Sequence, residues 1–334
     1  MSYSLRLVTD ISPSLMAELA MSGCSMTHAH NPGIVKILNH TFGWEGGAFE
    51  IMEDTTPVGY ISCMFIKGRI VSVPHFSYGG ILSAKPLRTD MYKEILPLLN
   101  HYFSGSSSHN IPYLIRDPER ISDFALDTKI VSWIPITNVD IEQAVPSAQM
   151  AKARKAIENG LFFKSGGFDL LTDFYRVYAW NMLRLGSPVL PLKLFAAILK
   201  NYSNGDARIF CVYKEKTPVG AAFLMSYKGF FENTWFSTLP EHNSCFPAQL
   251  LHLEMIRYSV QQQGHTYSFG RSSAGSGVHE FKRRWKTEET IIYWNYDKPL
   301  KHDMRKAEFL SKIWRLLPLK VANILGPVAG KWIY

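Results

Sequence analysis

The sequence predicts an α/β protein in which two related halves each contribute a mixed sheet, followed by a C-terminal amphipathic helical tail. Three observations lead to this fold class. The chain has 334 residues, enough for two domains. A stretch of the first half recurs in the second. The pattern of the second half predicts an antiparallel meander followed by a strand–helix–strand crossover, which requires two parallel strands. The predicted divisions are residues 1–145, 146–297 and 298–334.

The composition is that of a folded chain without a structural metal. Hydrophobic residues make up 46% and charged residues 19% of the sequence, which excludes a disordered protein. The four cysteines show no CxxC or Cys/His ligand spacing, so neither a disulfide scaffold nor a bound metal is expected. Because no signal peptide and no run of about 18 apolar residues is recognisable, we expect a cytoplasmic protein.

The net charge of +8 is unevenly distributed. Residues 1–140 carry 10 basic and 13 acidic groups, residues 141–297 carry 18 and 13, and residues 298–334 carry 8 and 2. Anionic partners should therefore contact the second half and the tail.

An internal repeat relates the two halves. Residues 49–68 and 210–229 share eight identities over twenty positions, at a constant offset of 161. The shared spacing predicts two copies of one meander, with strands at 49–52, 59–66 and 69–73 and again at 208–213, 220–227 and 231–238. The alternative is a coincidence between two hairpins with similar turn residues.

Helices and a crossover complete the second copy. Apolar periodicity predicts helices at 168–185, 191–202 and 247–263. A strand at 266–270 follows the last of these and should run parallel to the meander's final strand. A short helix at 278–285 and a strand at 290–296 are expected to complete the unit.

One segment carries a specific resemblance. Tyr267–Gly277 reads YSFGRSSAGSG and Phe281–Trp285 reads FKRRW. Together they are similar to the Phe-Gly-Arg-Ser … Gly … Phe-Lys-x-x-Trp signature of FemAB-like acyltransferases, which have the GNAT fold. Further positions resemble the subgroup associated with exosortase and exopolysaccharide systems: Val73–Ile81, Gln149–Gly160, Asp173–Val177, Asn181, Leu185–Pro188, Trp235, Asn243, Trp314–Pro318 and Gly326-Pro327.

The resemblance implies tandem GNAT-like domains and acyl transfer to an amine. Some members of the family move an amino acid from aminoacyl-tRNA onto a peptidoglycan precursor, and other relatives use acyl-CoA. With no Ser/His/Asp or Cys/His elbow in the sequence, direct transfer is expected. The family places its Phe-Lys pair at the reaction centre, which here is Phe281 and Lys282, with Lys282 stabilising the oxyanion. The alternative is a solvated lysine in a basic run.

Substrate contacts are expected around the same signature. Arg271 ends a predicted parallel strand, where a guanidinium can bind a phosphate or carboxylate, or hold a loop by an ion pair. Gly270, Ser272 and Ser273 offer close backbone approach and hydroxyls, or form an ordinary turn. Trp235 and Asn243 are candidates through the resemblance, although a tryptophan more often packs in a core.

Two further sets of residues are candidate substrate contacts. A tight turn is expected at Tyr78, Gly79 and Gly80, where it would present an exposed aromatic side chain to an acceptor. The alternative is an ordinary turn without a binding role. Arg154 and Lys155 offer positive charge for phosphates, or form a solvated helix face. His242 and His279 could act as bases but lie outside the signature.

The donor and the partners remain open at this level. The Arg/Gln-x-x-Gly-x-Gly/Ala loop typical of acetyl-CoA-dependent GNAT enzymes is replaced by Pro240–Ala248, which argues against ordinary acetyl-CoA use, while the helix N-terminus near Pro247 could still bind CoA. Aminoacyl-tRNA or acyl-CoA is thus the expected donor, without a tightly bound cofactor, and an envelope precursor or polysaccharide the expected acceptor; no DNA partner is expected.

The C-terminal tail has two possible roles, and acyl transfer has two alternatives. Residues 300–334 mix apolar and basic side chains, as in a segment lying on the anionic inner face of the cell membrane or packing on protein. A catalytically silent GNAT-like scaffold in an envelope polysaccharide or protein-sorting assembly is one rival reading. Nucleic-acid binding without chemistry is the other.

Overall fold

The computed structural model describes residues 3–22, 26–83, 89–105, 111–299 and 304–331. In this part of the chain the strands are β1 (Tyr3–Leu7), β2 (Glu45–Glu53), β3 (Thr56–Ile66), β4 (Arg69–Ser72), β5 (Leu82–Ser83), β6 (Tyr113–Asp117), β7 (Leu126–Pro135), β8 (Leu161–Gly166), β9 (Gly205–Lys214), β10 (Thr217–Tyr227), β11 (Phe230–Thr238), β12 (Thr266–Ser273) and β13 (Glu288–Tyr296).

The helices of the described chain are α1 (Pro13–Met21), α2 (Gly33–Phe42), α3 (Thr89–Ser104), α4 (Ile141–Ala144), α5 (Ser147–Glu158), α6 (Leu171–Leu185), α7 (Leu192–Asn201), α8 (Pro247–Gln261), α9 (Gly277–Arg283), α10 (Met304–Arg315) and α11 (Leu319–Gly330). Short 3₁₀ turns are η1 (His28–His30), η2 (Phe168–Leu170) and η3 (Pro240–Cys245). The elements predicted in the second half are all present, within a few residues of their expected bounds.

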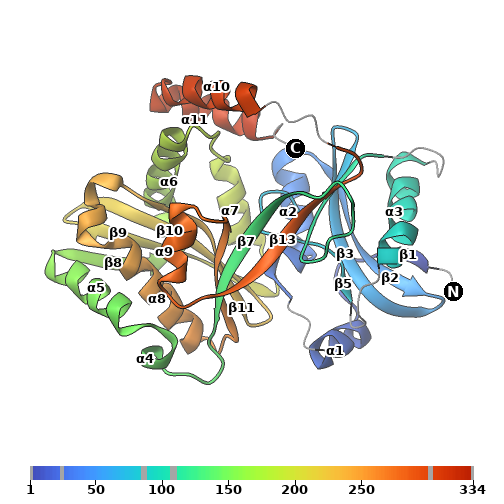
Figure 1. Ribbon diagram of the computed structural model, residues 1–334, viewed down its shortest axis with the longest axis horizontal. Coiled ribbons are helices and arrows are strands. Elements are labelled where there is room, and N and C mark those ends of the chain that lie inside the picture. The colour runs from blue at the N-terminus through green and yellow to red at the C-terminus, as the bar shows by residue number, and fades with distance from the viewer. Residues whose placement is uncertain (1–2, 23–25, 84–88, 106–110, 300–303, 332–334) are drawn as a thin grey trace.

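One mixed sheet runs through both halves of the molecule (Figure 1). Its strand order is β1-β2-β3-β4-β6-β13-β7-β12-β11-β10-β9-β8, with β5 added beside β3. The pairing of β11 with β12 is parallel, as the long crossover predicts. β4 and β6 form the corresponding parallel pair in the first half.

The predicted duplication is confirmed at both turns of each meander. The β2–β3 and β9–β10 turns place Asp54 and Glu215, 161 residues apart, at φ 53° and 54°. The β3–β4 turn has positive φ at Lys67 and Gly68, and the β10–β11 turn repeats this at Lys228 and Gly229. Two adjacent residues with positive φ form the tight turn that suits the right-handed twist of a hairpin.

The two meanders also share an irregularity inside their hairpins. β3 skips one residue of its ladder with β2 between Pro57 and Gly59, and β10 skips one with β9 between Pro218 and Gly220. The skipped residues, Val58 and Val219, are again 161 apart. Because an unpaired residue bends and twists a strand locally, a shared bulge is strong evidence for a common unit.

The two halves exchange their last strands. β7 follows β6 in the chain but pairs with β12 and β13, while β13 follows β12 but pairs with β6 and β7. The expectation that residues 290–296 complete the second unit is therefore wrong, because that strand closes the sheet of the first. Figure 1 shows β7 and β13 side by side between the halves.

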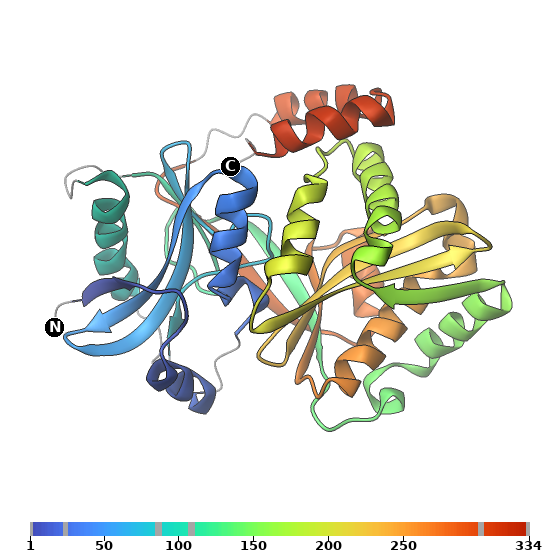
Figure 2. The same ribbon diagram turned by 180° about the vertical axis from the view of Figure 1, so that it is seen from behind.

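Helices cover both faces of this sheet. A continuous core involves α1 and α2 of the first half and α6 and α7 of the second, and Figure 2 shows these helices on one face. A second core lies between the opposite face and helices α5 and α8, and a third lies under α3. The halves therefore share one core across their junction.

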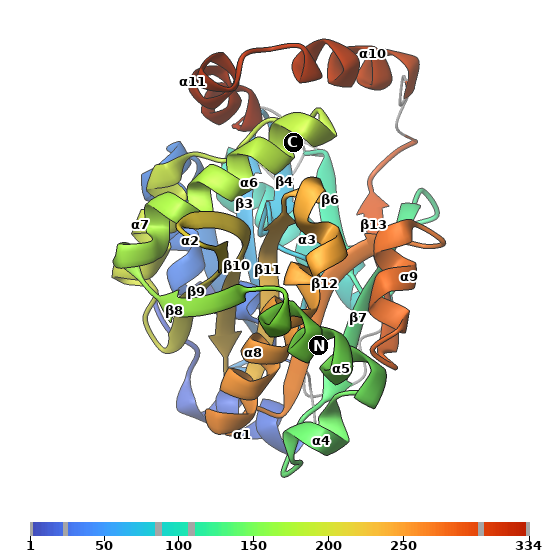
Figure 3. The same ribbon diagram turned by 90° about the vertical axis from the view of Figure 1, so that its left-hand side faces the viewer.

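The tail helices α10 and α11 pack against α6 (Figure 3). Within the described residues, no helix combines the length and apolar character needed to cross a bilayer. Cys63, Cys211 and Cys245 are free thiols. Cys24 lies outside the described residues.

Candidate active site

The parallel pair β11–β12 separates at the junction of the two halves. Hydrogen-bonded pairing runs from Phe230 opposite Thr266 to Glu232 opposite Ser268, and both strands continue beyond it. Just past this point Gly270 adopts φ 71°, and a Cβ there would lie 3.0 Å from the Asn233 carbonyl oxygen. Glycine is therefore suited to the turn that leads β12 away from β11.

Glu232 is the acidic group at this divergence. Its side chain is fully buried, with Oε1 accepting a hydrogen bond from Ser77 Oγ at 2.7 Å and Oε2 accepting one from Ser268 Oγ at 2.9 Å. Burial raises the pKa of the Glu232 carboxyl, although the two hydroxyls and the nearby positive charges of Lys282 and Arg271 oppose the shift. A raised pKa suits a carboxylate that accepts a proton.

Lys282, the predicted catalytic residue, lies at the same place. It is 5% exposed, and its Nζ donates to the carbonyl oxygens of Gly270 at 2.7 Å and Arg271 at 3.0 Å. Burial lowers the pKa of this amine to about 7, partly countered by the Glu232 charge. An ammonium has three N–H donors, so one remains for a developing oxyanion.

Phe281, the other predicted residue of this pair, is half-buried on α9. Its ring centroid lies 5.6 Å from that of His252 and 6.3 Å from that of Trp285. This aromatic packing anchors the short helix that carries Lys282.

His28 completes the cluster from the first half. Its Nε2 lies 3.6 Å from Glu232 Oε1, and neither ring nitrogen has a hydrogen-bond partner among the described residues. Burial lowers the pKa of His28 to about 3, so the ring is neutral at pH 7. Sequence reasoning missed both His28 and Glu232. Glu232 has a faint signal, as the acidic residue within the apolar run FFENTWF, whereas His28 belongs to no motif.

Arg271 joins the second half to the segment Val73–Ile81 of the first. Its Nη1 donates to the Phe76 carbonyl oxygen at 3.1 Å, and its guanidinium carbon lies 5.5 Å from the centre of the Trp294 ring system. The Phe76 ring in turn lies 5.7 Å from Trp235. The Arg271 side chain therefore holds the Val73–Ile81 segment, whose Ser77 bonds Glu232.

We expect Arg271→Ala to raise the apparent KM and to destabilise the fold by about 1–3 kcal/mol, because a charged hydrogen bond to a largely buried carbonyl is lost. Urea unfolding and steady-state kinetics measured on the same preparation separate the two effects. Loss of stability with an unchanged KM would assign Arg271 a structural role alone.

The segment around Tyr78 differs from the prediction. Tyr78 is not an exposed aromatic: it is 8% exposed and packs with Val131 and Ile292. Gly79 and Gly80 do not have positive φ but lack room for a side chain, since a Cβ on Gly80 would lie 1.5 Å from Asp117 Oδ2. Tertiary packing, not an exposed turn, accounts for these residues.

The corresponding divergence in the first half is filled by a side chain. By register, Val71 on β4 corresponds to Glu232, and Arg116 on β6 corresponds to Gly270. Arg116 is fully buried and donates to the carbonyl oxygens of Ser72, Val73 and Phe76, the last at 2.7 Å. The acidic group and the glycine are thus confined to the second half.

The two serines of the signature contact residues of β7. Ser272 is 8% exposed, with its Oγ 3.5 Å from the Ile130 carbonyl oxygen. Ser273 is exposed and accepts a hydrogen bond from Lys129 Nζ at 2.9 Å.

Four other predicted contacts lie apart from the cluster or inside the core. Arg154 and Lys155 are exposed on α5, and Lys155 pairs with Glu158 at 3.1 Å. Trp235 is buried against Phe195 and Phe223, with ring centroids 5.0 and 5.5 Å away. Asn243 is exposed in η3, where its Oδ1 accepts from Thr238 Oγ1 at 3.0 Å.

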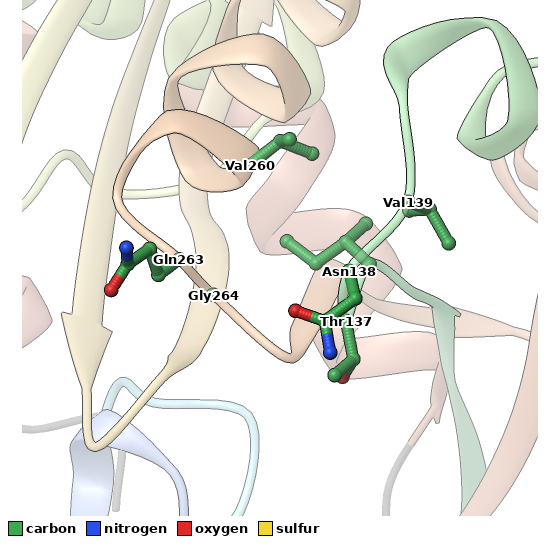
Figure 4. A pocket seen from close by; sticks show the side chains of 7 residues that line it. Thr137, Asn138, Val139, Val260, Gln263 and Gly264 are labelled. Atoms are coloured by element: carbon green, nitrogen blue, oxygen red, sulfur yellow. The ribbon is translucent and has the colours of Figure 1, made fainter.

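A hollow of about 310 Å³ lies at another position. The residues lining it come from the last turn of α8 and from the segments that follow β7 and α8: Ile136, Thr137, Asn138, Val139, Val260, Gln263 and Gly264 (Figure 4). It contains none of the predicted site residues. Among the described residues, no group of three or more His, Cys, Asp or Glu side chains is placed to hold a metal ion.

Comparison with known proteins identifies the fold. Residues 148–283 match the family model described as an acetyltransferase (GNAT) domain. Search of the curated proteins finds no matching sequence. The matched segment includes the β11–β12 divergence and ends one residue after Lys282.

Solved structures extend the likeness to nearly the whole chain. FemX is 12% identical, with a TM-score of 0.59, over 93% of this chain and 100% of that chain. A tandem GNAT protein from the clavulanic acid biosynthesis pathway is 8% identical, with a TM-score of 0.56, over 88% and 98%. The C-terminal domain of a putative lysylphosphatidylglycerol synthetase from Agrobacterium fabrum is 9% identical, with a TM-score of 0.55, over 90% and 96%. The chain therefore shares the fold of these proteins, and residues 148–283 correspond to a GNAT domain.

Proposed function

We propose that the protein is an N-acyltransferase that transfers an acyl or aminoacyl group directly from a tRNA or CoA donor to an amine. One observation carries the proposal: a buried carboxylate, Glu232, and a buried amine, Lys282, lie together at the β11–β12 divergence inside the GNAT segment. A chain of hydrogen bonds links the two groups: Ser268 Oγ donates to Glu232 Oε2 and accepts from the Gly270 backbone N–H, and the Gly270 carbonyl oxygen accepts from Lys282 Nζ. Such pairing of titratable groups is characteristic of active sites.

The two groups supply complementary steps. The acceptor amine attacks the carbonyl carbon of the donor's ester or thioester, and its proton passes to the Glu232 carboxylate. Lys282, in its ammonium form, stabilises the oxygen that becomes negative in the tetrahedral intermediate. When this intermediate collapses, the C–O or C–S bond breaks and the departing oxygen or sulfur takes the proton from Glu232. The products are an amide and a free hydroxyl or thiol.

The features around α8 accommodate either donor. The helix begins without a side-chain cap, so its first backbone N–H groups can face the pyrophosphate of CoA. The surplus of basic residues in 141–297 equally suits the phosphates of a tRNA acceptor stem. We therefore propose one of these two as the donor; the side chains at the divergence favour neither.

The acceptor we propose is an amine of a cell-envelope precursor or exopolysaccharide. This rests on the similarity of the sequence to the exosortase-associated FemAB-like subgroup, carried by segments such as Gln149–Gly160, Asp173–Val177 and Leu185–Pro188. The filled divergence of the first half supports one transfer centre per chain, with the first half free to bind the acceptor.

The test is a transfer assay on the full chain. Purified protein is incubated with a set of acyl-CoAs or aminoacyl-tRNAs and with amino sugars, diamino acids and envelope precursors, and amide products are identified by mass spectrometry. We expect a new amide together with released CoA thiol or uncharged tRNA, and much less of both products with Glu232→Gln. Binding of the donors without turnover across the set would favour the silent scaffold.

A further inference from the structure

Several large apolar side chains of the tail helices α10 and α11 and of the turn between them are exposed. On α10, Phe309 and Ile313 are four residues apart and share one face, and Leu316 is the first residue after the helix. They are 62%, 44% and 84% exposed. A helix packed on a soluble protein normally places such side chains against the core.

Contacts on the other side of α10 fix this orientation. Ser311 Oγ and Arg315 Nη2 both lie 3.5 Å from the Leu185 carbonyl oxygen at the end of α6. Residues 311 and 315 are four apart, and their face is opposite that of Phe309 and Ile313. The polar face of the helix therefore meets the protein, and the apolar face points away.

The second tail helix repeats the arrangement. Ala322, Gly326 and Gly330 share the inward face and are buried, and a Cβ on Gly326 would lie 2.6 Å from Val189 Cγ1. On the outward face, Ile324 and Val328 are 72% and 62% exposed. Small residues thus permit close docking on the α6–α7 connection, while Ile324 and Val328 remain in contact with solvent.

Basic residues border both outward faces. The segment 304–331 contains six lysine and arginine residues and one glutamate. Lys312 and Lys320 are exposed, and each lies on the helix beside the outward apolar row. An apolar surface bordered by positive charge complements an anionic lipid bilayer, into which apolar side chains insert while lysines meet headgroup phosphates.

We propose that α10 and α11 together form a docking surface for a bilayer that contains anionic lipids. A second copy of the chain fits less well, because two such faces would bring their positive charges together. The surface is independent of the proposed acyl transfer, and its test uses no substrate. If both proposals hold, the enzyme would meet acceptors that are carried on lipid.

The test is co-sedimentation of the full chain with phosphatidylcholine vesicles, with and without phosphatidylglycerol. Wild-type protein should bind the anionic vesicles and release them at high salt, because screening weakens the attraction of the lysines. Leu316→Asp and Ile324→Asp should each weaken binding by about tenfold or more, since an apolar side chain no longer inserts. Lys312→Gln and Lys320→Gln should each weaken binding to anionic vesicles alone, by about fivefold.

Met21→Asp provides the matched control. Met21 on α1 is 81% exposed, close to the 84% of Leu316, so the same acidic substitution is made at an equally exposed apolar position. It should bind vesicles as the wild type does, and all variants should melt at the wild-type temperature because the replaced side chains are solvent-exposed. Equal binding by the wild type, Leu316→Asp and Met21→Asp, or no wild-type binding, would overturn the proposal. So would a dimer that Leu316→Asp dissociates in the absence of vesicle binding.

Discussion

Glu232→Gln is expected to lower kcat by about 10²- to 10³-fold, as loss of a general base does. The amide has the size of the carboxyl group and can still bond both Ser77 and Ser268, but it cannot accept the acceptor amine's proton. Burial raises the pKa of the Glu232 carboxyl, so wild-type activity should rise with pH as this group ionises. That acidic limb should be missing from the pH–rate profile of Glu232→Gln.

Glu50→Gln serves as the control for removal of a buried carboxylate. Glu50 is also fully buried, but it lies on β2 in the first half, where it accepts hydrogen bonds from the Arg6 side chain and the Ser12 backbone amide. Its replacement should lower the free energy of unfolding and leave kcat unchanged, because no proposed step involves it. Wild-type kcat in folded Glu232→Gln would remove Glu232 from the mechanism.

The duplication could be predicted because residues in the turns themselves specify it. Lys-Gly and Thr-Pro-Val-Gly determine where each meander turns and where it bulges, and these positions recur at one offset. The strand exchange could not be predicted in the same way. The composition of residues 126–135 and 288–296 favours strands, but it does not specify which of two equivalent sheet edges each will join.

Only those residues of the candidate site that belong to a sequence motif could be predicted. Lys282 is identified by the FKRRW signature, while Glu232 acquires its environment from Ser77, 155 residues earlier in the chain. The burial of Tyr78 likewise depends on distant residues, Val131 and Ile292. An aromatic residue beside two glycines is typical of an exposed turn, but here Asp117 on a neighbouring strand leaves no room for a side chain at Gly80.

The sequence predicts the helices of the tail but not their orientation on the protein. Its apolar and basic periodicity predicts amphipathic helices, but periodicity alone does not determine which face meets the protein. The small residues Ala322 and Gly326 decide this, because they let α11 approach Val189 closely. The orientation of the apolar face is thus a property of tertiary packing.

Lys282→Met is expected to lower kcat by about 10²-fold with little change in substrate affinity, as for loss of one oxyanion donor. Burial lowers the pKa of the wild-type amine to about 7. The ammonium that stabilises the oxyanion is therefore lost as pH rises through 7, and wild-type activity should fall above that pH. In Lys282→Met this basic limb should be absent, because the group that titrates has been removed.

Stability measurements on the same variant test the environment of Lys282 separately from its role. Its pKa is about 7 in the folded chain and 10.5 when unperturbed, so between these values the unfolded chain binds more protons. The lysine's contribution to the free energy of unfolding therefore rises with pH across this window. Urea unfolding should show a larger gain in stability from pH 7 to pH 9 for the wild type than for Lys282→Met.

The control is Lys286→Met, which replaces an exposed lysine in the same basic run. This variant should follow the wild type in both kinetics and stability. Full activity of folded Lys282→Met, or a basic limb that persists in it, would refute the assigned role.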